Sequence, residues 1–176
     1  QVTAIGSHGQ TIRHHPDASP AFSIQIGDPN TIAELTGITT VADFRQRDIA
    51  AGGQGAPLLP IFHKKVLIQD KHDIVLNLGG IANISFLDTH GQLMGFDTGP
   101  ANLLMDHWIN QHQGKAYDKD GEWARTGQLN EKLLAHLKDE LYFSQPAPKS
   151  TGRELFNSTW LDSKLSTLHS TNIPAE

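Results

Sequence analysis

The order of apolar and polar residues predicts strands that alternate with helices in the first third of the chain. The pattern typical of β-strands occurs at residues 2–5, 21–26 and 39–42. Ile32 and Leu35 have helical spacing and predict a short helix that ends at Gly37. The polar residues 6–11 and 43–48 predict loops. Strands that alternate with helices favour an α/β fold.

In the rest of the chain the pattern changes from strands to helices. Strands are predicted at residues 74–78, 81–87 and 92–96, joined by tight turns. Apolar residues recur with the period of a helix at residues 58–65, 103–109 and 129–141. Residues 143–152 contain two prolines and predict an extended surface crossing. Ser158 then predicts the cap of a last helix, which carries Leu161, Leu165 and Leu168.

Residues 51–57 have the most flexible composition of the chain. They include three glycines and one proline, which is typical of a hinge or a domain boundary. We therefore expect two domains, one at residues 1–56 and one at residues 57–176. Residues 1–6 have neither an initiator methionine nor the regions of a signal peptide, so we expect an upstream part of the protein to be missing.

The composition of the chain excludes several classes of protein and of partner. The 176 residues are 38% apolar and 19% charged, enough to bury a core, and no apolar run reaches the roughly 18 residues that span a bilayer. A net charge of −5 with scattered Lys and Arg argues against nucleic acid or an anionic membrane as the partner. The absence of cysteine excludes disulfides and thiolate chemistry and suits a cytoplasmic protein. Small molecules or other proteins are better candidate partners.

The first candidate site is a glycine turn at Gly79-Gly80, which lies between two strongly β-forming segments. Backbone N–H groups at such a turn can bind phosphate oxygens, because no Cβ atom blocks a close approach. An ordinary tight hairpin explains the same pattern, and both interpretations stay open. The turn is not a P-loop, since neither Gly-Lys-Ser nor Gly-Lys-Thr follows it.

The second candidate is Asp97, a carboxylate at the end of a predicted strand. A carboxylate at this edge of a sheet can act as a general base that deprotonates a water molecule or a hydroxyl group. A turn-stabilising or helix-capping aspartate is the alternative. The tripeptide Asp97-Thr98-Gly99 also occurs in aspartic proteases, but here it leads into a helical segment, and the chain has no second copy to complete a catalytic pair.

Other polar residues are weaker candidates. Arg45 and Asp48 are suited to line a substrate cleft, although a loop of mixed charge is more often only solvated. His8 and Gln10 can hydrogen-bond a sugar, or they can stabilise their own loop. The ten histidines form no metal-binding pattern, so no dedicated protein metal site is expected.

Six sequence blocks occur in a fixed order along the chain. They are AIGSHGQT at 4–11, DFR at 43–45 with Asp48, GGQGAPL at 52–58, NLGGIAN at 77–83, DTGP at 97–100 and QPAPKSTGRE at 145–154. This series resembles the signature of the anhydro-N-acetylmuramic acid kinases. The resemblance covers roughly residues 3–162.

The resemblance implies two actin-like (ribonuclease H-like) α/β domains around a cleft. It implies a cytoplasmic enzyme that uses ATP and Mg²⁺, held mainly through the phosphates, to phosphorylate 1,6-anhydro-N-acetylmuramic acid while water opens the anhydro ring. It also implies a homodimer for the full-length enzyme, in peptidoglycan recycling. By the same resemblance Asp97 is the catalytic base, and Gly79, Gly80 and Asn83 bind ATP. Asn102 and Asp106 join the cleft candidates by position.

Two departures from the family pattern qualify this expectation. Ala101 stands where the family usually has a glycine, which matters if that position needs a positive φ. The N-terminal phosphate loop and the C-terminal adenosine-binding segment of the family have no counterpart here. We therefore expect a fragment with doubtful activity alone. The alternative is a non-catalytic remnant of the same fold that binds a sugar or a muropeptide.

Overall fold

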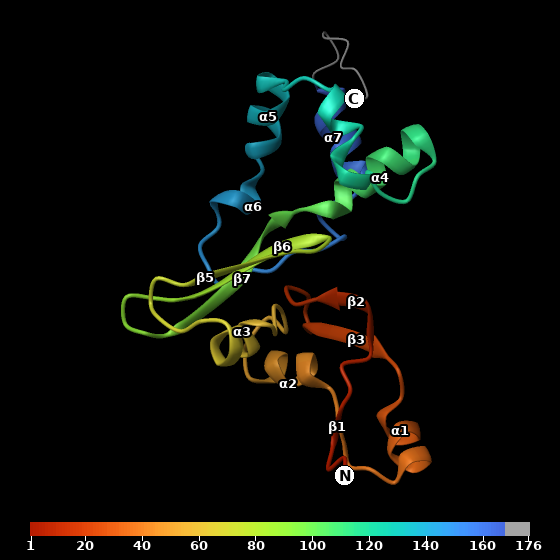
Figure 1. The fold of residues 1–176 in the computed structure, drawn as a ribbon, viewed down its shortest axis with the longest axis vertical. Coiled ribbons are helices and arrows are strands. Elements are labelled where there is room, and N and C mark those ends of the chain that lie inside the picture. The colour runs from red at the N-terminus through yellow and green to blue at the C-terminus, as the bar shows by residue number, and fades with distance from the viewer. Residues whose placement is uncertain (168–176) are drawn as a thin grey trace. The chain divides into compact units, whose positions relative to one another are not determined.

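The chain forms two compact units, Gln1–Leu58 and Leu59–Glu176. The computed structural model describes residues 1–167, and Figure 1 labels their helices and strands. Both helices and sheets occur, so the predicted mixed α/β class is confirmed. No described helix combines the length and the apolar character needed to cross a bilayer.

The first unit contains two small sheets and two helices. Strand β1 (Ile5–Gly6) pairs in parallel with β4 (Thr40–Val41). Strand β2 (Gln10–His15) pairs in antiparallel fashion with β3 (Phe22–Ile26). The helices are α1 (Pro29–Thr36) and α2 (Phe44–Ala50).

Helix α1 has the start and stop signals of a stable short helix. The Asp28 carboxylate accepts hydrogen bonds from the N–H groups of Asn30 and Thr31, which would otherwise have no partner within the helix. Gly37 ends the helix with φ 63°, in the left-handed region that favours glycine. The predicted stop at Gly37 is therefore confirmed.

The loop predictions for this unit are wrong in two places. Strand β2 begins at Gln10, inside the predicted loop at residues 6–11. Helix α2 occupies most of the predicted loop at residues 43–48. Residues 45–48 of α2 are all polar, so this helix lacks the apolar stripe by which a helix is recognised in a sequence. Its side chains are used for hydrogen bonds instead.

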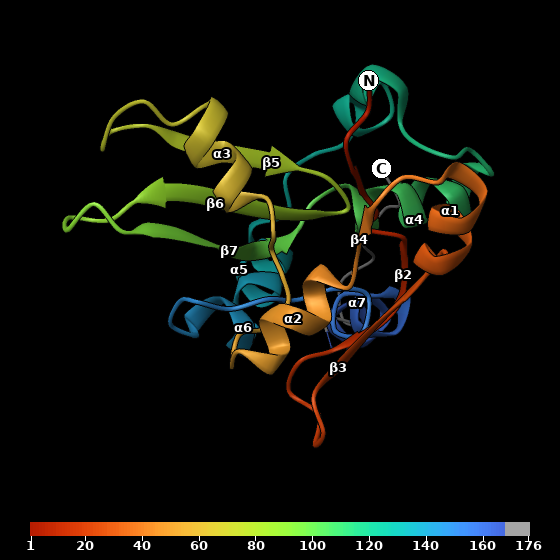
Figure 2. The same ribbon diagram turned by 90° about the horizontal axis from the view of Figure 1, so that it is seen from below.

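The second unit is built on a three-stranded antiparallel sheet, which confirms the predicted strands. Its order is β5 (Ile74–Leu78), β6 (Ile81–Leu87) and β7 (Leu93–Pro100). Helix α3 (Pro60–Val66) lies along one face of this sheet, as Figure 2 shows. The contact includes a hydrogen-bonded pair of buried side chains, His63 Nδ1 and Ser85 Oγ, 2.9 Å apart.

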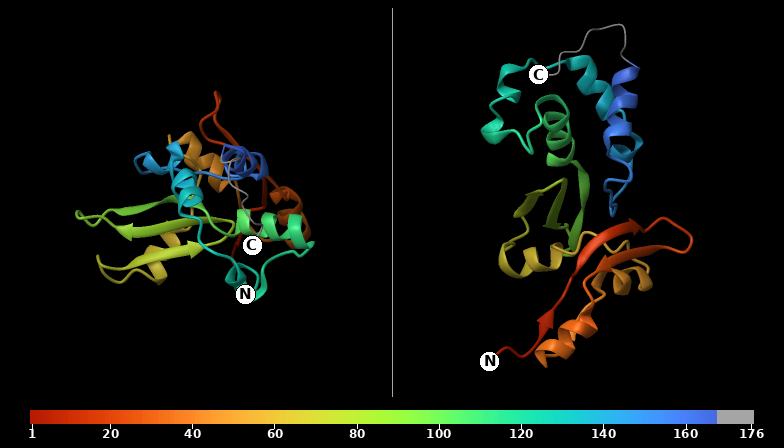
Figure 3. Two further views of the ribbon diagram at one scale, coloured as in Figure 1. Left: turned by 90° about the horizontal axis from the view of Figure 1, so that it is seen from above. Right: turned by 90° about the vertical axis from the view of Figure 1, so that its right-hand side faces the viewer.

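Four helices complete the second unit. They are α4 (Asn102–Gln113), α5 (Glu131–Lys138), α6 (Leu141–Ser144) and α7 (Ser158–Ser166). Between α4 and α5 lie short 3-10 turns at Lys119–Gly121 and Ala124–Thr126. Helices α4 and α5 each contact α7, and Figure 3 shows the three grouped beyond the end of the sheet. Fully buried Phe156 packs against the rings of Tyr142, Phe143 and Trp160.

The start of α7 corrects one prediction. The helix does begin at Ser158, but its cap is Asn157, whose side chain accepts a hydrogen bond from the Trp160 N–H. Asparagine caps a helix as well as serine does, and the sequence offers both in adjacent positions. Leu168 of the predicted stripe lies outside the described residues.

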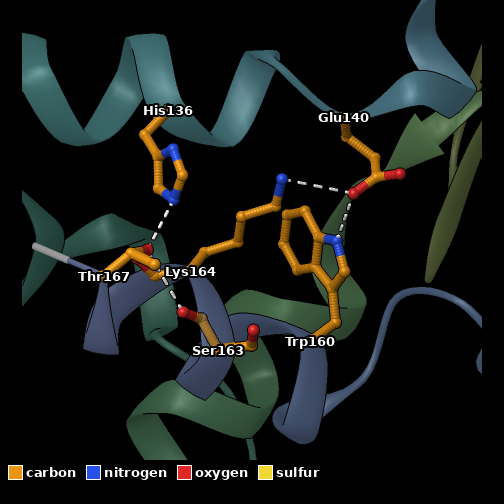
Figure 4. A network of polar contacts seen from close by, with 6 residues as sticks. All are labelled: His136, Glu140, Trp160, Ser163, Lys164 and Thr167. Carbon is orange, nitrogen blue, oxygen red and sulfur yellow. Dashed lines mark hydrogen bonds and ion pairs between the residues drawn. The ribbon is translucent and has the colours of Figure 1, made fainter.

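A polar network joins α7 to the segment between α5 and α6 (Figure 4). The Glu140 carboxylate accepts a hydrogen bond from Trp160 Nε1 at 2.8 Å and lies 3.3 Å from Lys164 Nζ. His136 and Thr167 form a second contact of 2.7 Å. The hydrogen bond from Trp160, followed by the contact with Lys164, holds the pKa of Glu140 below its usual value.

Candidate active site

Arg45 is the centre of a hydrogen-bonded cluster in the first unit. Its Nε donates to His8 Nε2 at 2.9 Å, and its Nη1 donates to the Gly55 carbonyl oxygen at 2.6 Å. His8 Nδ1 lies 2.8 Å from the Gly9 carbonyl oxygen. One ring nitrogen therefore accepts and the other donates, which is the neutral imidazole with its proton on Nδ1. The predicted pair His8 and Arg45 is in contact.

Asp48 also binds the glycine-rich loop at residues 51–55, through Gly55. Its Oδ2 accepts a hydrogen bond from the Gly55 N–H at 2.7 Å. Arg45 and Asp48 are three positions apart on α2 and share one face of the helix. Together they bind both backbone polar groups of Gly55, so they order residues 51–55. Gln10 lies outside this cluster, and its exposed side chain donates to the neighbouring Thr11 carbonyl.

Asp97, in β7 of the second unit, is only 6% exposed. Its carboxylate Oδ2 accepts a hydrogen bond from the Thr151 N–H at 3.0 Å. Its backbone N–H donates to the Lys149 carbonyl oxygen at 3.0 Å, and its own carbonyl accepts from the Tyr142 hydroxyl at 2.7 Å. A buried carboxylate is costly without such partners. Three separate contacts therefore hold this residue in place.

The Tyr142 hydroxyl is a permanent donor in this arrangement. Tyr142 is 3% exposed, and burial raises the pKa of its hydroxyl well above the usual value. The negative charges of Asp97 and Glu154 raise it further. Tyr142 consequently stays protonated throughout the physiological pH range and keeps its hydrogen bond to the Asp97 carbonyl.

Asn83 lies directly opposite Asp97 in the pairing of β6 with β7, which places both side chains on one face of the sheet. Asn83 is 8% exposed. Within residues 1–167, Asn83 Oδ1 and Thr151 Oγ1 are buried without a hydrogen-bond partner. Such groups are rare in folded proteins. An amide oxygen beside Asp97 and the hydroxyl of the residue bound to its carboxylate are thus available to a bound ligand or water.

The Gly79-Gly80 turn joins β5 to β6, so the predicted hairpin exists. Its two carbonyl groups accept hydrogen bonds from the N–H groups at the start of α4, which belong to Ala101, Asn102 and Leu103. Neither glycine has a positive φ. A Cβ atom at Gly79 or Gly80 would meet no atom closer than 3.6 Å or 3.7 Å respectively. The described fold itself therefore does not require glycine at either position.

The profile of the anhydro-N-acetylmuramic acid kinase family matches residues 1–176. The chain belongs to this family. It is 57% identical over 176 residues to the anhydro-N-acetylmuramic acid kinase of Photobacterium profundum, covering 99% of this chain and 46% of that protein. The protein of the same name from Pasteurella multocida is 58% identical over 166 residues, covering 94% of this chain and 44% of that protein.

The protein of that name from Vibrio cholerae is 55% identical over 167 residues, which cover 94% of this chain and 45% of that protein. The chain thus spans about half the length of these members of the kinase family. Family membership agrees with the resemblance carried by the six sequence blocks.

The remaining candidate site residues lie on helix α4. Asn102 is its exposed first residue, and Asp106, half-buried, lies one turn later on the same face. Ala101, which precedes the helix, has φ −122°. Its backbone therefore needs no positive φ, and alanine is accommodated where the family usually has glycine.

The sequence interpretation missed the residues that hold Asp97. Residues 143–152 were predicted to cross the surface, but Lys149 is only 8% exposed. Residues 143–148 are exposed, as predicted, whereas the Lys149 ammonium group donates to the Tyr142 and Phe143 carbonyls. The Lys149 carbonyl pairs with β7 at Asp97. The sequence block at 145–154 contains both Lys149 and Thr151. By itself it indicated only a resemblance to the family, not a contact with Asp97.

Proposed function

We propose that the protein is a kinase that transfers phosphate from ATP to 1,6-anhydro-N-acetylmuramic acid and opens the anhydro ring with water. The product is N-acetylmuramic acid 6-phosphate. The observation that carries the proposal is the arrangement of Asp97, a buried carboxylate within β7 that is fixed by the Thr151 N–H. Membership of the kinase family supports the same reaction.

In this reaction Asp97 is the general base. It takes a proton from a water molecule, the water oxygen bonds to the anomeric carbon, and the bond from that carbon to O6 breaks. The electron pair left on O6 forms the new bond to phosphorus, so no free alkoxide has to be released. The γ-phosphoryl group comes from ATP: its bond to the β,γ-bridging oxygen breaks as the bond to O6 forms, and ADP leaves. Mg²⁺ held by the phosphates would neutralise their charge. The fixed carboxylate is oriented before substrate arrives, which lowers the entropic part of the barrier.

The nucleotide is assigned to the turn at Gly79-Gly80 with Asn83. Within the described residues, neither the space around Gly79 and Gly80 nor their backbone conformation requires glycine. A ligand that lies close to the backbone would explain both glycines, which supports this assignment. The unpartnered Asn83 Oδ1 adds an acceptor for a hydroxyl, an amine or a metal-bound water. No cluster of three or more His, Asp or Glu suited to a metal occurs within residues 1–167, so Mg²⁺ is assigned to the phosphates.

The sugar is assigned to polar residues of both units. They are His8, Gln10, Arg45 and Asp48 in the first unit, and Asn102 and Asp106 in the second. Arg45 suits a carboxylate group such as the lactyl carboxylate of the substrate, because guanidinium is a paired donor. Further parts of the proposal are two actin-like domains around a cleft, divided at residues 56 and 57, a cytoplasmic location and a homodimer.

The test is an assay of the protein expressed from its complete gene. ATP, Mg²⁺ and 1,6-anhydro-N-acetylmuramic acid are supplied, and ADP and the sugar product are measured. We expect equal amounts of ADP and N-acetylmuramic acid 6-phosphate. Calorimetric binding of the sugar without ADP formation would contradict the kinase and favour a binding protein of the same fold.

A further inference from the structure

Lys149 is a buried cation that the proposed reaction does not use. It is 8% exposed, and its ammonium group donates to the carbonyl oxygens of Tyr142 at 2.8 Å and Phe143 at 3.2 Å. The same group lies 4.7 Å from the centre of the Tyr142 ring. A buried charge is retained only where such partners replace water.

The carbonyl groups that Lys149 binds belong to α6, a helix of four residues. The last carbonyls of a helix have no partner within it, and a cation near them is favoured. The ammonium group therefore ties α6 to the segment that follows it. Without it, the carbonyls of Tyr142 and Phe143 would each lose a partner, and Tyr142 is a buried residue.

The backbone on either side of this anchor holds Asp97. The Lys149 carbonyl accepts from the Asp97 N–H, and the Thr151 N–H donates to the Asp97 carboxylate. The Tyr142 hydroxyl binds the Asp97 carbonyl. All three contacts come from residues 142–151, and Lys149 fastens the two ends of this segment to each other.

We propose that Lys149 is a positioning residue for Asp97. Its side chain fixes residues 142–151, and these fix the direction and the charged form of the carboxylate. The inference rests on the proposed function, in which Asp97 is the base. Lys149 itself does not contact the reacting atoms in this proposal.

The first test changes Lys149 to methionine, which keeps the length of the side chain and removes its charge. In the protein from the complete gene we expect kcat to fall about tenfold to a hundredfold, with the KM of ATP and of the sugar within about twofold. The acid limb of kcat against pH should move to higher pH, because a less firmly held Thr151 N–H stabilises the charged form of the carboxylate less. Exposed Lys132 on α5, changed to methionine, is the control and should have no effect.

The second test does not depend on activity. In the 176-residue chain, hydrogen exchange measured by NMR should be at least about tenfold faster for the amides of Asp97 and Thr151 in Lys149→Met. The amides that pair β5 with β6 should be unchanged. Tyr142→Phe removes only the hydroxyl contact, and it should lower kcat by a smaller factor than Lys149→Met does.

The outcomes separate the inference from the function on which it rests. If the unsubstituted protein transfers phosphate and Lys149→Met retains its kcat, pH profile and amide exchange, the positioning role is wrong and the kinase stands. If the unsubstituted protein transfers no phosphate, the proposed function is wrong. In that case unchanged exchange at Asp97 and Thr151 overturns the structural role of Lys149, and accelerated exchange supports it.

Discussion

At the scale of single residues, Arg45 shows how one side chain can order a glycine-rich loop. Its guanidinium group donates in two directions, to His8 and to the Gly55 carbonyl. Lysine has the same charge but cannot present this rigid pair of donors. The geometry of the donor, rather than its charge, is therefore the feature that holds residues 51–55.

Arg45→Lys should consequently destabilise the protein. We expect the free energy of unfolding to fall by about 1.5–3 kcal/mol, the usual cost of losing a hydrogen bond to a charged group. Chemical denaturation at pH 7 measures this difference. Arg47→Lys, at an exposed position of the same helix, is the matched control. Equal stability of the two variants would show that the cluster contributes nothing to folding.

A substitution at Gly79 tests whether a bound ligand explains the two glycines of the turn. Gly79→Ala should leave the thermal stability unchanged, since the new Cβ atom meets nothing closer than 3.6 Å. It should raise the KM of ATP, because a methyl group then faces the phosphate. Gly99→Ala is the contrasting variant: Gly99 has φ 145°, and its added Cβ atom would lie 2.7 Å from the Phe143 ring. A destabilised Gly79→Ala protein would refute the argument from open space.

At the scale of elements, α7 is attached to the rest of its unit through Glu140, which contacts Trp160 and Lys164 (Figure 4). The folded state holds the pKa of Glu140 below its ordinary value of 4.5. The carboxylate therefore contributes stability at pH values above about 4.5, and this contribution is lost as the pH falls through the lower folded value.

Glu140→Gln should remove that pH-dependent contribution. At pH 7 we expect unfolding to cost about 1–2 kcal/mol less, and the difference from the unsubstituted protein should shrink as the pH falls below about 4.5. Melting curves between pH 7 and pH 3 measure both effects. Glu131→Gln, at an exposed position of α5, is the control. A difference that stays constant with pH would contradict this account of the network.

Elements with a regular local pattern of apolar residues were predictable from the sequence. The strands at β5 and β6 match the prediction because their alternation and their turn are local properties. Helix α2 was missed because its residues 45–48 are all polar, so the sequence shows no apolar stripe. The contact of the Lys149 carbonyl with Asp97 was missed for another reason: Asp97 lies about fifty positions away, and no local pattern indicates a contact of that range.

At the scale of the whole molecule, the candidate residues divide between two units. In the first unit Arg45 contacts His8, and Arg45 and Asp48 both bind Gly55. In the second, Asp97, Asn83 and Thr151 lie together. The sequence named all of these residues as candidates except Gly55 and Thr151. The supports of each group, from Gly55 and from residues 142–151, required the structure because they are backbone contacts that any residue type can make.

The most direct test of the central claim is the activity of Asp97→Asn in the protein from the complete gene. Asparagine keeps the size of the side chain and removes the base. We predict that kcat falls by about 10²–10⁴-fold, while calorimetry finds the affinity for 1,6-anhydro-N-acetylmuramic acid within about tenfold of the original. Asp162→Asn, an exposed position on α7, should keep full activity. An Asp97→Asn protein that turns over at the unsubstituted rate would contradict the assignment of Asp97 as the catalytic base.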